Sequence, residues 1–432
     1  MYPAYDPTAS KKDFRVAIVG GGMVGLACAV GLARFGIHAD VFEAAPRFDE
    51  VGAGVGLGPN ALRALDGLGL LDAVLAQTDG AQKTARRMSY VSGLGDHQVV
   101  YDYESCAAFT EADNGIGIYR PVFLKAVLPL LPSKSAARFN KRAISICQLP
   151  SGAYLLQFAD GTTHEADLVI GADGIRSSAR AAVVGADKAK NALEFTNTVA
   201  YRGLVPLETL QRDGIKTDLS QRLHNFVGID KHIIVFPIRS GQIINIVAFA
   251  TDNSVPEGSV EVDGPWVEPV PQQELLDRYA GWGPDVFIML KQLKAPSKWY
   301  IHQLTPLETY VNGKIVLIGD AAHAMCPHLG SGVGQGFEDV LVLCELLGHE
   351  STNLSNLEAA LEAYDAVRRP RANMVLERSH RAGRIYEAYG QRGYQTPEDM
   401  ERHLANIWQP IWRHDLQKDI DSAIEWLQKL QK

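Results

Sequence analysis

The sequence predicts an α/β fold in which a Rossmann-like dinucleotide-binding domain is interleaved with a β-sheet domain and followed by C-terminal helices. Three turns far apart along the chain predict this arrangement: glycine-rich residues 20–25, Ala-Asp-Gly at 172–174 and Gly-Asp at 319–320. Each turn follows a short apolar run rich in β-branched residues, which is typical of a buried parallel strand. We therefore expect the three turns to face one bound ligand from three sides.

The first turn carries a dinucleotide-binding pattern. Residues 14–19 read as a strand and residues 23–35 as a helix, and the turn between them has the form Gly-x-Gly-x-x-Gly. Glycine lets the backbone turn tightly and approach a pyrophosphate, which the partly positive N-terminus of the helix favours. The glycines of the pattern are Gly20, Gly22 and Gly25.

An acidic residue follows at the spacing that this pattern requires. Residues 38–42 read as a second strand, and Glu43 ends it. An acid about 20 positions after the first glycine accepts a hydrogen bond from a ribose hydroxyl. Strand, glycine turn, helix and acid together predict a bound dinucleotide.

Composition excludes several other classes of protein. The 432 residues carry a net charge of -8 with scattered basic residues, so no nucleic-acid partner is expected, and no metal site is expected either. Residues 16–33 lack charge and are an alternative membrane helix, but the glycines in their first half disfavour it. Five cysteines without a Cys-x-x-Cys pair indicate reduced thiols. We expect no membrane association, a cytoplasmic location and, by default, a homodimer.

The second and third turns add polar groups beside the expected ligand. Ala-Asp-Gly at 172–174 ends the strand at 167–171, and Arg176, Ser177 and Arg180 follow with cationic and hydroxyl donors. Asp320 ends the strand at 315–318 and can accept from a sugar-alcohol hydroxyl. The glycines at 330–336 let backbone amides approach a phosphate or a flat ring.

The three motifs together resemble the class A flavoprotein monooxygenases, and within them the salicylate hydroxylase group. The resemblance covers residues 12–380 and includes the stretches at 51–70 and 120–128. It implies a fold like that of p-hydroxybenzoate hydroxylase, non-covalent FAD, and NADH or NADPH as co-substrate. The implied FAD-binding residues are Gly20, Gly22, Gly25, Glu43, Arg120, Asp173, Asp320, Gly332, Val333 and Gly334.

Motif positions imply domains that alternate along the chain. We expect the FAD-binding domain at 12–75, 112–185 and 291–349, and the substrate domain at 76–111 and 186–290. The substrate domain is expected to be a sheet, because β-rich runs joined by turn residues fill its second segment. Residues 350–432 have a helical pattern, and Trp408, Trp412 and Trp426 are expected to pack there rather than to bind a ligand.

A base for the substrate is the main catalytic expectation. A phenolate is a stronger nucleophile than a phenol, so a group that takes the phenol proton promotes hydroxylation. His328 follows Pro327 in the loop where the family places a residue facing substrate beside the flavin; the alternative is a structural loop histidine. His323, nearer the strand, is expected to organise the backbone. The further substrate-binding candidates are Tyr201, Arg202, His224, Phe236 and Pro327.

The resemblance implies hydroxylation of a small aromatic acid with NAD(P)H and O2. Salicylate converted to catechol with loss of carbon dioxide is the expected reaction. The open alternatives within the family are 4-hydroxybenzoate 1-hydroxylase and 3-hydroxybenzoate 6-hydroxylase activity. A flavin reductase without oxygen insertion and an inactive nucleotide-binding protein are alternatives of other classes. The intact Pro327-His328 loop disfavours the inactive protein.

Overall fold

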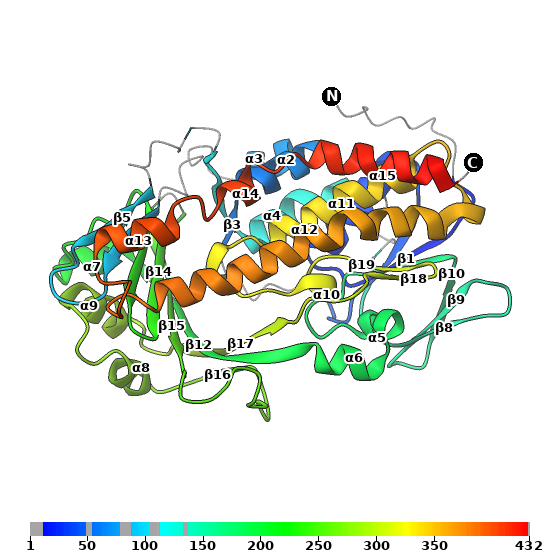
Figure 1. The fold of residues 1–432 in the computed structure, drawn as a ribbon. Coiled ribbons are helices and arrows are strands. Elements are labelled where there is room, and N and C mark those ends of the chain that lie inside the picture. Colours follow the sequence, from blue (N-terminus) through cyan, green and yellow to red (C-terminus); the bar gives the residue numbers. More distant parts are fainter. Residues whose placement is uncertain are drawn as a thin grey trace.

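The computed structural model describes residues 12–48, 54–77, 88–103, 110, 113–132, 137–239 and 241–430. It places a smaller, mostly parallel sheet at one end of the molecule and a larger, mostly antiparallel sheet at the other (Figure 1). Long helices run over both (Figure 1). The predicted α/β class with an added β-sheet domain and C-terminal helices is confirmed.

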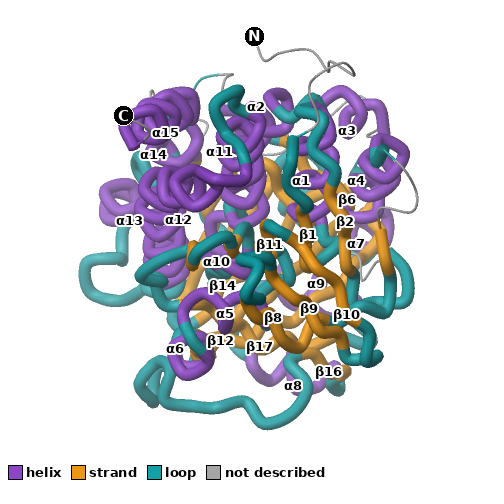
Figure 2. The backbone as a smooth tube through the Cα atoms, turned by 90° about the vertical axis from the view of Figure 1, so that its right-hand side faces the viewer, coloured by secondary structure: helices purple, strands orange, loops and turns teal. Residues whose placement is uncertain are grey.

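The smaller sheet joins the strands that precede the three turns. β1 (Val16–Val19) pairs in parallel with β2 (Ala39–Phe42) on one side and with β11 (Leu168–Gly171) on the other. β19 (Ile315–Leu317) pairs in parallel with β11. Figure 2 shows β11, β1 and β2 side by side. Because parallel strands end at the same edge of a sheet, the three turns meet there. The sheet is completed by β7 (Ala137–Arg138) beside β2 and β18 (Val311–Asn312) beside β19.

Helices from four parts of the chain surround this sheet, in one hydrophobic core with it. Helices α1 (Met23–Arg34) and α2 (Pro59–Gly67) both contact α11 (Gly332–Gly348), and α11 contacts α12 (Leu357–Tyr386) and α15 (Leu416–Leu430). Figure 1 shows α11, α12 and α15 lying alongside one another. The other elements here are α3 (Leu71–Gln77), α4 (Arg120–Val127), α5 (Ser178–Val184), α6 (Ala186–Asn191), α10 (Asp320–His323), and the strands β8 (Ala143–Gln148), β9 (Tyr154–Phe158) and β10 (Thr163–Ala166).

The larger sheet has eight strands in the order β16-β17-β12-β15-β14-β13-β4-β5. Its central strands are β12 (Leu193–Pro206), β15 (Ile243–Thr251) and β14 (Lys231–Ile238). One face buries a second core against the short helices of this domain. The remaining strands and helices are β4 (Met88–Ser92), β5 (Val99–Asp102), β13 (Leu223–Gly228), β16 (Val267–Pro269), β17 (Ser297–Leu304), α7 (Leu207–Arg212), α8 (Gln272–Arg278) and α9 (Pro284–Gln292).

One strand crosses the expected domain boundary. β17 lies inside the segment 291–349 that we expected to bind FAD, but it pairs with β12 and so extends the larger sheet. β3 (Gly54–Leu57) and β6 (Ile116–Tyr119) form a two-stranded ribbon. Along the chain, each of these strands lies between a strand of the smaller sheet and a strand of the larger sheet. The division of the chain into two interleaved domains remains a prediction, with this strand assigned to the sheet domain.

The C-terminal region is helical, as its pattern predicts. It contains α12, α13 (Pro397–Leu404), α14 (Gln409–Trp412) and α15. Trp408 and Trp412 are buried and stacked with ring centres 5.3 Å apart, whereas Trp426 is exposed, so the expectation that it packs was wrong. No helix in the described part of the chain combines the length and apolarity needed to cross a bilayer.

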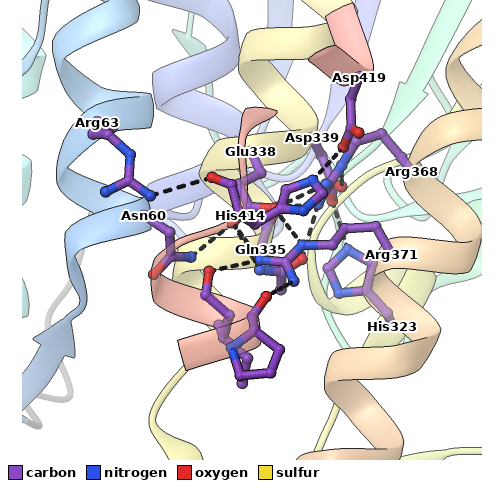
Figure 3. Close-up of polar contacts among 12 residues, drawn as sticks. Asn60, Arg63, His323, Gln335, Glu338, Asp339, Arg368, Arg371, His414 and Asp419 are labelled. Carbon is purple, nitrogen blue, oxygen red and sulfur yellow. Dashed lines mark hydrogen bonds and ion pairs between the residues drawn. The ribbon is translucent and has the colours of Figure 1, made fainter. Parts of the chain in front are cut away.

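A buried network of charges fixes α11 against α12 (Figure 3). Arg368 donates to Asp339 over 2.8 Å and to Glu338 over 2.9 Å, and all three side chains are inaccessible to solvent or nearly so. Asp339 also accepts from the backbone N–H of Gly319 and contacts Nε2 of His323 at 2.5 Å. The network therefore holds the third turn in place, and His323 organises this turn as expected.

Candidate active site

The first turn is shaped by close contact with the second. Gly20 has φ +108, and a Cβ on it would lie 2.2 Å from the carbonyl oxygen of Ala172. A Cβ on Gly25 would lie 2.1 Å from the carbonyl oxygen of Gly20. Gly22 precedes α1 in extended conformation and provides no side-chain cap, so the first amides of the helix are left for a ligand.

Glu43 holds the same turn from the other side. Its carboxylate accepts from the backbone N–H of Gly21 over 2.7 Å and from that of Ala45 over 2.8 Å. Each carboxylate oxygen has a second lone pair, so an additional bond from a ribose hydroxyl is compatible with these two. The predicted ribose contact remains a prediction.

Arg120 lies beside the N-terminus of α1. It is the first residue of α4, and a Cβ built on Gly22 would be 3.9 Å from its Nη2. Its Nε is buried and has no hydrogen-bond partner in the described structure. A buried donor on a cation next to free helix amides fits a pyrophosphate, which supplies acceptors and opposite charge.

Asp173 is engaged within its own turn. Its carboxylate accepts from the hydroxyl groups of Ser177 and Ser178 and from the backbone N–H groups of Ser178 and Ala179, at 2.5 to 3.2 Å. These four bonds cap the start of α5. The geometry gives Asp173 the role of shaping the turn, and its direct contact with FAD stays a prediction.

A cavity of about 440 Å³ opens beside the third turn. The walls come from the loop after β19, from the β3–β6 ribbon and from the central strands of the larger sheet. Asp320 is exposed where it opens into this cavity, and desolvation by the surrounding protein atoms raises the pKa of its carboxyl. Gly332 and Val333 line it at the start of α11, whereas Gly334 packs on α2, where a Cβ would be 3.1 Å from that of Ala61.

His328 lies in a short 3-10 helix (Pro327–Leu329), and both it and Pro327 line this cavity. Its ring is buried among other rings, with centres 5.1 Å from His232 and 5.3 Å from Phe249. Its Nδ1 has no hydrogen-bond partner among the residues that the structure describes. Burial, together with the nearby His232, lowers the pKa of His328 to about 3, so the imidazole is neutral near pH 7.

Arg202 brings positive charge to the same cavity. Its guanidinium lies over the ring of Trp299, 4.9 Å from the ring centre. Within the described residues no carboxylate forms an ion pair with it, and burial lowers its pKa. An uncompensated cation over an aromatic wall is suited to a carboxylate ligand. Phe236 completes an apolar wall and lies so close to Gly54 that a Cβ on this glycine would be 2.9 Å from the ring.

Two sequence-predicted substrate residues lie on the wrong face of the sheet. Ala200 and Arg202 line the cavity, so Tyr201 between them points into the opposite core and donates to Glu274 over 2.8 Å. His224 lines a separate cavity of about 380 Å³, while its neighbour Leu223 lines the first. The structure therefore corrects both predictions, because side chains alternate across a strand.

The sequence missed several residues of the cavity wall. Trp408 and Trp412, expected only to pack, also line the cavity, as does Trp299 of β17. Trp408 and Trp412 are more than 40 residues from any of the three motifs. For the strand that contains Trp299, the sequence did not show which face points to the cavity, so no local pattern identified these three residues. Their rings make the cavity suited to a flat aromatic ligand.

Arg120→Ala is expected to weaken FAD binding by roughly ten- to a hundredfold, because a hydrogen bond to a charged group contributes about 1.5 to 3 kcal/mol. The check is titration of the apoprotein with FAD, followed by flavin fluorescence. Lys125→Ala is the matched control, since Lys125 is an exposed cation on the same helix. Equal dissociation constants for all three proteins would exclude Arg120 from the pyrophosphate site.

The residues present fit FAD. The glycine turn and Arg120 suit its pyrophosphate, Glu43 its ribose, and the cavity with Gly332 and Val333 its ring system. Denaturation is expected to release the flavin, because FAD is expected to bind non-covalently.

Comparison with known proteins agrees with this FAD site. We call the glycine turn, Glu43, Arg120 and the adjoining cavity the FAD cradle. The family described as FAD binding domain matches residues 13–379. A salicylate hydroxylase of Pseudomonas putida is 40% identical over 427 residues, which cover 96% of this chain and 95% of that protein. The 6-methylsalicylate 1-monooxygenase of Aspergillus terreus is 33% identical over 95% of this chain and 91% of its own.

Solved structures give the same assignment. A salicylate hydroxylase in a substrate complex superposes with a TM-score of 0.83 at 33% identity, over 96% of this chain and 98% of the other. The protein is an enzyme that uses FAD. The chain belongs to the family of FAD-dependent monooxygenases that includes the salicylate hydroxylases.

Proposed function

We propose that this enzyme is a salicylate 1-monooxygenase. Salicylate, O2 and a reduced nicotinamide would be converted to catechol, carbon dioxide, water and oxidised nicotinamide. One oxygen atom would enter the ring at the carboxyl-bearing carbon, and the other would leave as water. The observation that carries the proposal is the presence of an unpaired cation, Arg202, and a neutral imidazole, His328, in one apolar cavity beside the FAD cradle.

Arg202 would bind the carboxylate of salicylate. Its planar fork of N–H donors matches a carboxylate, and its position over Trp299 leaves those donors free for a ligand in the cavity. Binding of an anion would also compensate a buried positive charge. This pairing orients the ring so that the carboxyl-bearing carbon is held in a fixed place.

His328 would interact with the phenol hydroxyl. A neutral imidazole has one acceptor nitrogen, so it can accept the hydrogen bond and then the proton. Loss of that proton raises the electron density of the ring carbon that is hydroxylated. Bound FAD supplies the redox chemistry that transfers oxygen from O2 with electrons from the nicotinamide.

The aromatic and aliphatic walls would exclude water. Four apolar side chains line the cavity: Phe236, Phe249, Trp299 and Ile301. The indole N–H of Trp299 is the one polar hydrogen among these four side chains, and it donates to Ser297 over 2.9 Å. A dry cavity strengthens the Arg202–carboxylate interaction and protects reactive species from hydrolysis.

A panel of ring acids tests the proposal. Holoenzyme is incubated with NADH and, separately, with salicylate, 3-hydroxybenzoate, 4-hydroxybenzoate and phenol, and both product and carbon dioxide are measured. Salicylate is expected to stimulate NADH oxidation most strongly and to give catechol. Gentisate or hydroquinone as the main product would assign the 3-hydroxybenzoate or 4-hydroxybenzoate activity instead. If NADH were oxidised at the same rate with each compound as in the absence of any aromatic compound, the protein would be a reductase.

Arg202→Gln is expected to raise the KM for salicylate by roughly ten- to a hundredfold, the range for loss of a charged hydrogen-bonding partner. The effect on phenol, which has no carboxylate, is expected to be small. Steady-state kinetics on both compounds measure the difference. Arg212→Gln, at an exposed position of α7, is the control. Equal changes for salicylate and phenol would separate Arg202 from the carboxylate.

The setting of the enzyme is part of the proposal. We infer a cytoplasmic protein that acts on a small aromatic acid with O2 and NADH or NADPH. A homodimer is the expected assembly, by analogy with most oligomeric enzymes. Sedimentation of the holoenzyme and fractionation of the producing cells test these two points.

A further inference from the structure

A second histidine lies directly behind His328. His232 of β14 is completely buried, and its ring centre is 5.1 Å from that of His328 with the planes at 62°. Phe249 stacks on His232 with ring centres 4.5 Å apart and also contacts His328. The two imidazoles are therefore held edge to face by a shared aromatic neighbour that lines the cavity.

His232 is paired on its far side with a carboxylate. Its Nδ1 lies 3.0 Å from Oε1 of Glu387, which follows the last residue of α12 and is itself buried. A carboxylate can only accept in this contact, so Nδ1 carries the proton and Nε2 of His232 is an acceptor. The pair joins the larger sheet to the C-terminal helix.

The two facing histidines each have an unsatisfied nitrogen. Nε2 of His232 and Nδ1 of His328 are both buried and have no hydrogen-bond partner among the described residues. Buried polar atoms normally have partners, and an unsatisfied one is costly. One acceptor and one potential donor on adjacent rings are complementary, and a small rotation or one bridging water would join them.

We propose that His232 and Glu387 form a proton relay that carries the phenol proton away from His328. The relay rests on the proposed function, which supplies the phenol. The phenol proton moves to the cavity-facing nitrogen of His328, and the proton on Nδ1 of His328 moves to Nε2 of His232. The proton on Nδ1 of His232 then moves to Glu387, so one phenolate and one carboxylic acid are formed. His328 contacts the substrate, and His232 and Glu387 act through it.

The proton affinities of the three protein groups agree with transfer from His328 through His232 to Glu387. Burial lowers the pKa values of His328 and His232 to about 3, so neither ring retains an extra proton near pH 7. Burial raises the pKa of Glu387 to about 7. A proton is therefore more stable on Glu387 than on either histidine, and Glu387 is a terminal acceptor that can be emptied at mildly alkaline pH.

Polar and charged groups surround Glu387. Its carboxylate accepts a hydrogen bond from the side chain of Thr251, and its backbone carbonyl accepts from the N–H of Asp230 over 2.8 Å. Asp230 raises the pKa of Glu387, whereas the exposed Arg384 and the nearby His328 lower it. The ionisable groups around the relay are Asp230, Glu257, Tyr279, Cys326, His380 and Arg384.

Glu387→Gln tests the relay because the amide keeps the size of the side chain and can accept from His232 but cannot take a proton. Glu257→Gln is the matched control: it removes another acid–histidine pair, in which Glu257 of the loop after β15 lies 2.8 Å from His380 of α12. Hydroxylation of salicylate by pre-reduced holoenzyme is followed in a single turnover over a range of pH around about 7. Dissociation constants of FAD and salicylate are measured in parallel.

In the wild type and in Glu257→Gln, the hydroxylation rate is expected to rise with pH through about 7, because only the ionised Glu387 can accept. Glu387→Gln is expected to lack this rise and to be slower by roughly tenfold or more, with both dissociation constants changed less than about twofold. His232→Gln is expected to behave in the same way. If the hydroxylation rate of Glu387→Gln still rises with pH through about 7, whatever its absolute value, the relay is overturned. His232 and Glu387 would then be a structural pair.

A second measurement does not depend on turnover. The infrared carbonyl band of a protonated carboxylic acid, recorded for substrate-free holoenzyme, is expected to titrate near pH 7 and to be missing in Glu387→Gln but present in Glu257→Gln. Absence of this band from the wild type would overturn the relay even if a variant failed to fold. If the wild type did not convert salicylate but showed the band, the proposed substrate would be wrong and the relay supported.

Discussion

His328→Ala is expected to lower the hydroxylation rate by roughly a hundredfold or more, the range typical of lost general-base catalysis, while FAD stays bound. The histidine lines the cavity but does not lie in the glycine turn or beside Arg120, so cofactor affinity is expected to change little. The loss is expected to shrink as pH rises toward the pKa of a phenol, about 10, because solvent then supplies the phenolate.

Rapid mixing of reduced variant enzyme with O2 and salicylate measures this step directly. His224→Ala is the matched control, because His224 of β13 is also a buried histidine but lines the other cavity. Its hydroxylation rate is expected to stay near that of the wild type. A normal rate for His328→Ala over about pH 6 to 9, around the ordinary histidine pKa, would return His328 to a structural role.

The largest effect on stability is expected from Arg368→Leu. This change leaves Glu338 and Asp339 buried with a partner removed, which costs about 3 to 5 kcal/mol. Burial by itself would raise the pKa of Glu338, but Arg371 and Arg368 outweigh it and hold the value at about 2. Because Asp339 also binds the N–H of Gly319, loss of Arg368 is expected to loosen the third turn as well.

Urea denaturation of the holoenzyme, followed by circular dichroism, measures the change in free energy of unfolding. Arg369→Leu is the control: Arg369 is the next residue on α12 and pairs with Asp365 at the surface, 32% exposed, where a salt bridge contributes about 0 to 1 kcal/mol. Equal losses for the two variants would mean that the buried network does not stabilise the fold more than a surface pair does.

The FAD cradle could be predicted because its signals are local. Glycine at positions 20 and 25 is required by contacts of about 2 Å that any Cβ would make, and the turn that imposes this requirement is visible in the sequence. The strands that precede the three turns are short, apolar and β-branched, so their place in a parallel sheet followed directly.

The faces of the larger sheet could not be predicted. In β12, residues 195–201 are buried on both sides of the strand, so hydrophobic alternation does not distinguish them. A register shift between Phe195 and Thr198 further disturbs the alternation. For this reason Tyr201 was expected to face the cavity although it lies in the opposite core, whereas Arg202 does line the cavity and its contact with substrate stays a prediction.

Long-range polar pairs were also beyond the sequence. His232 and Glu387 are 155 positions apart, and neither stands in a motif. Arg368 and Arg371 are part of a helix with many charged residues, which reads as a solvated face, yet both are buried. Only the packing of α11 on α12 brings their acidic partners close enough for the charges to be tolerated.

The most direct test of the central claim is the stoichiometry of one reaction. Holoenzyme is incubated with NADH, isotopically heavy O2 and salicylate labelled at its carboxyl carbon. We expect one labelled carbon dioxide and one catechol containing a single heavy oxygen atom for each NADH consumed in coupled turnover. NADH consumption that yields peroxide, without labelled carbon dioxide and without heavy oxygen in any aromatic product, would contradict the assignment of this chain as a salicylate 1-monooxygenase.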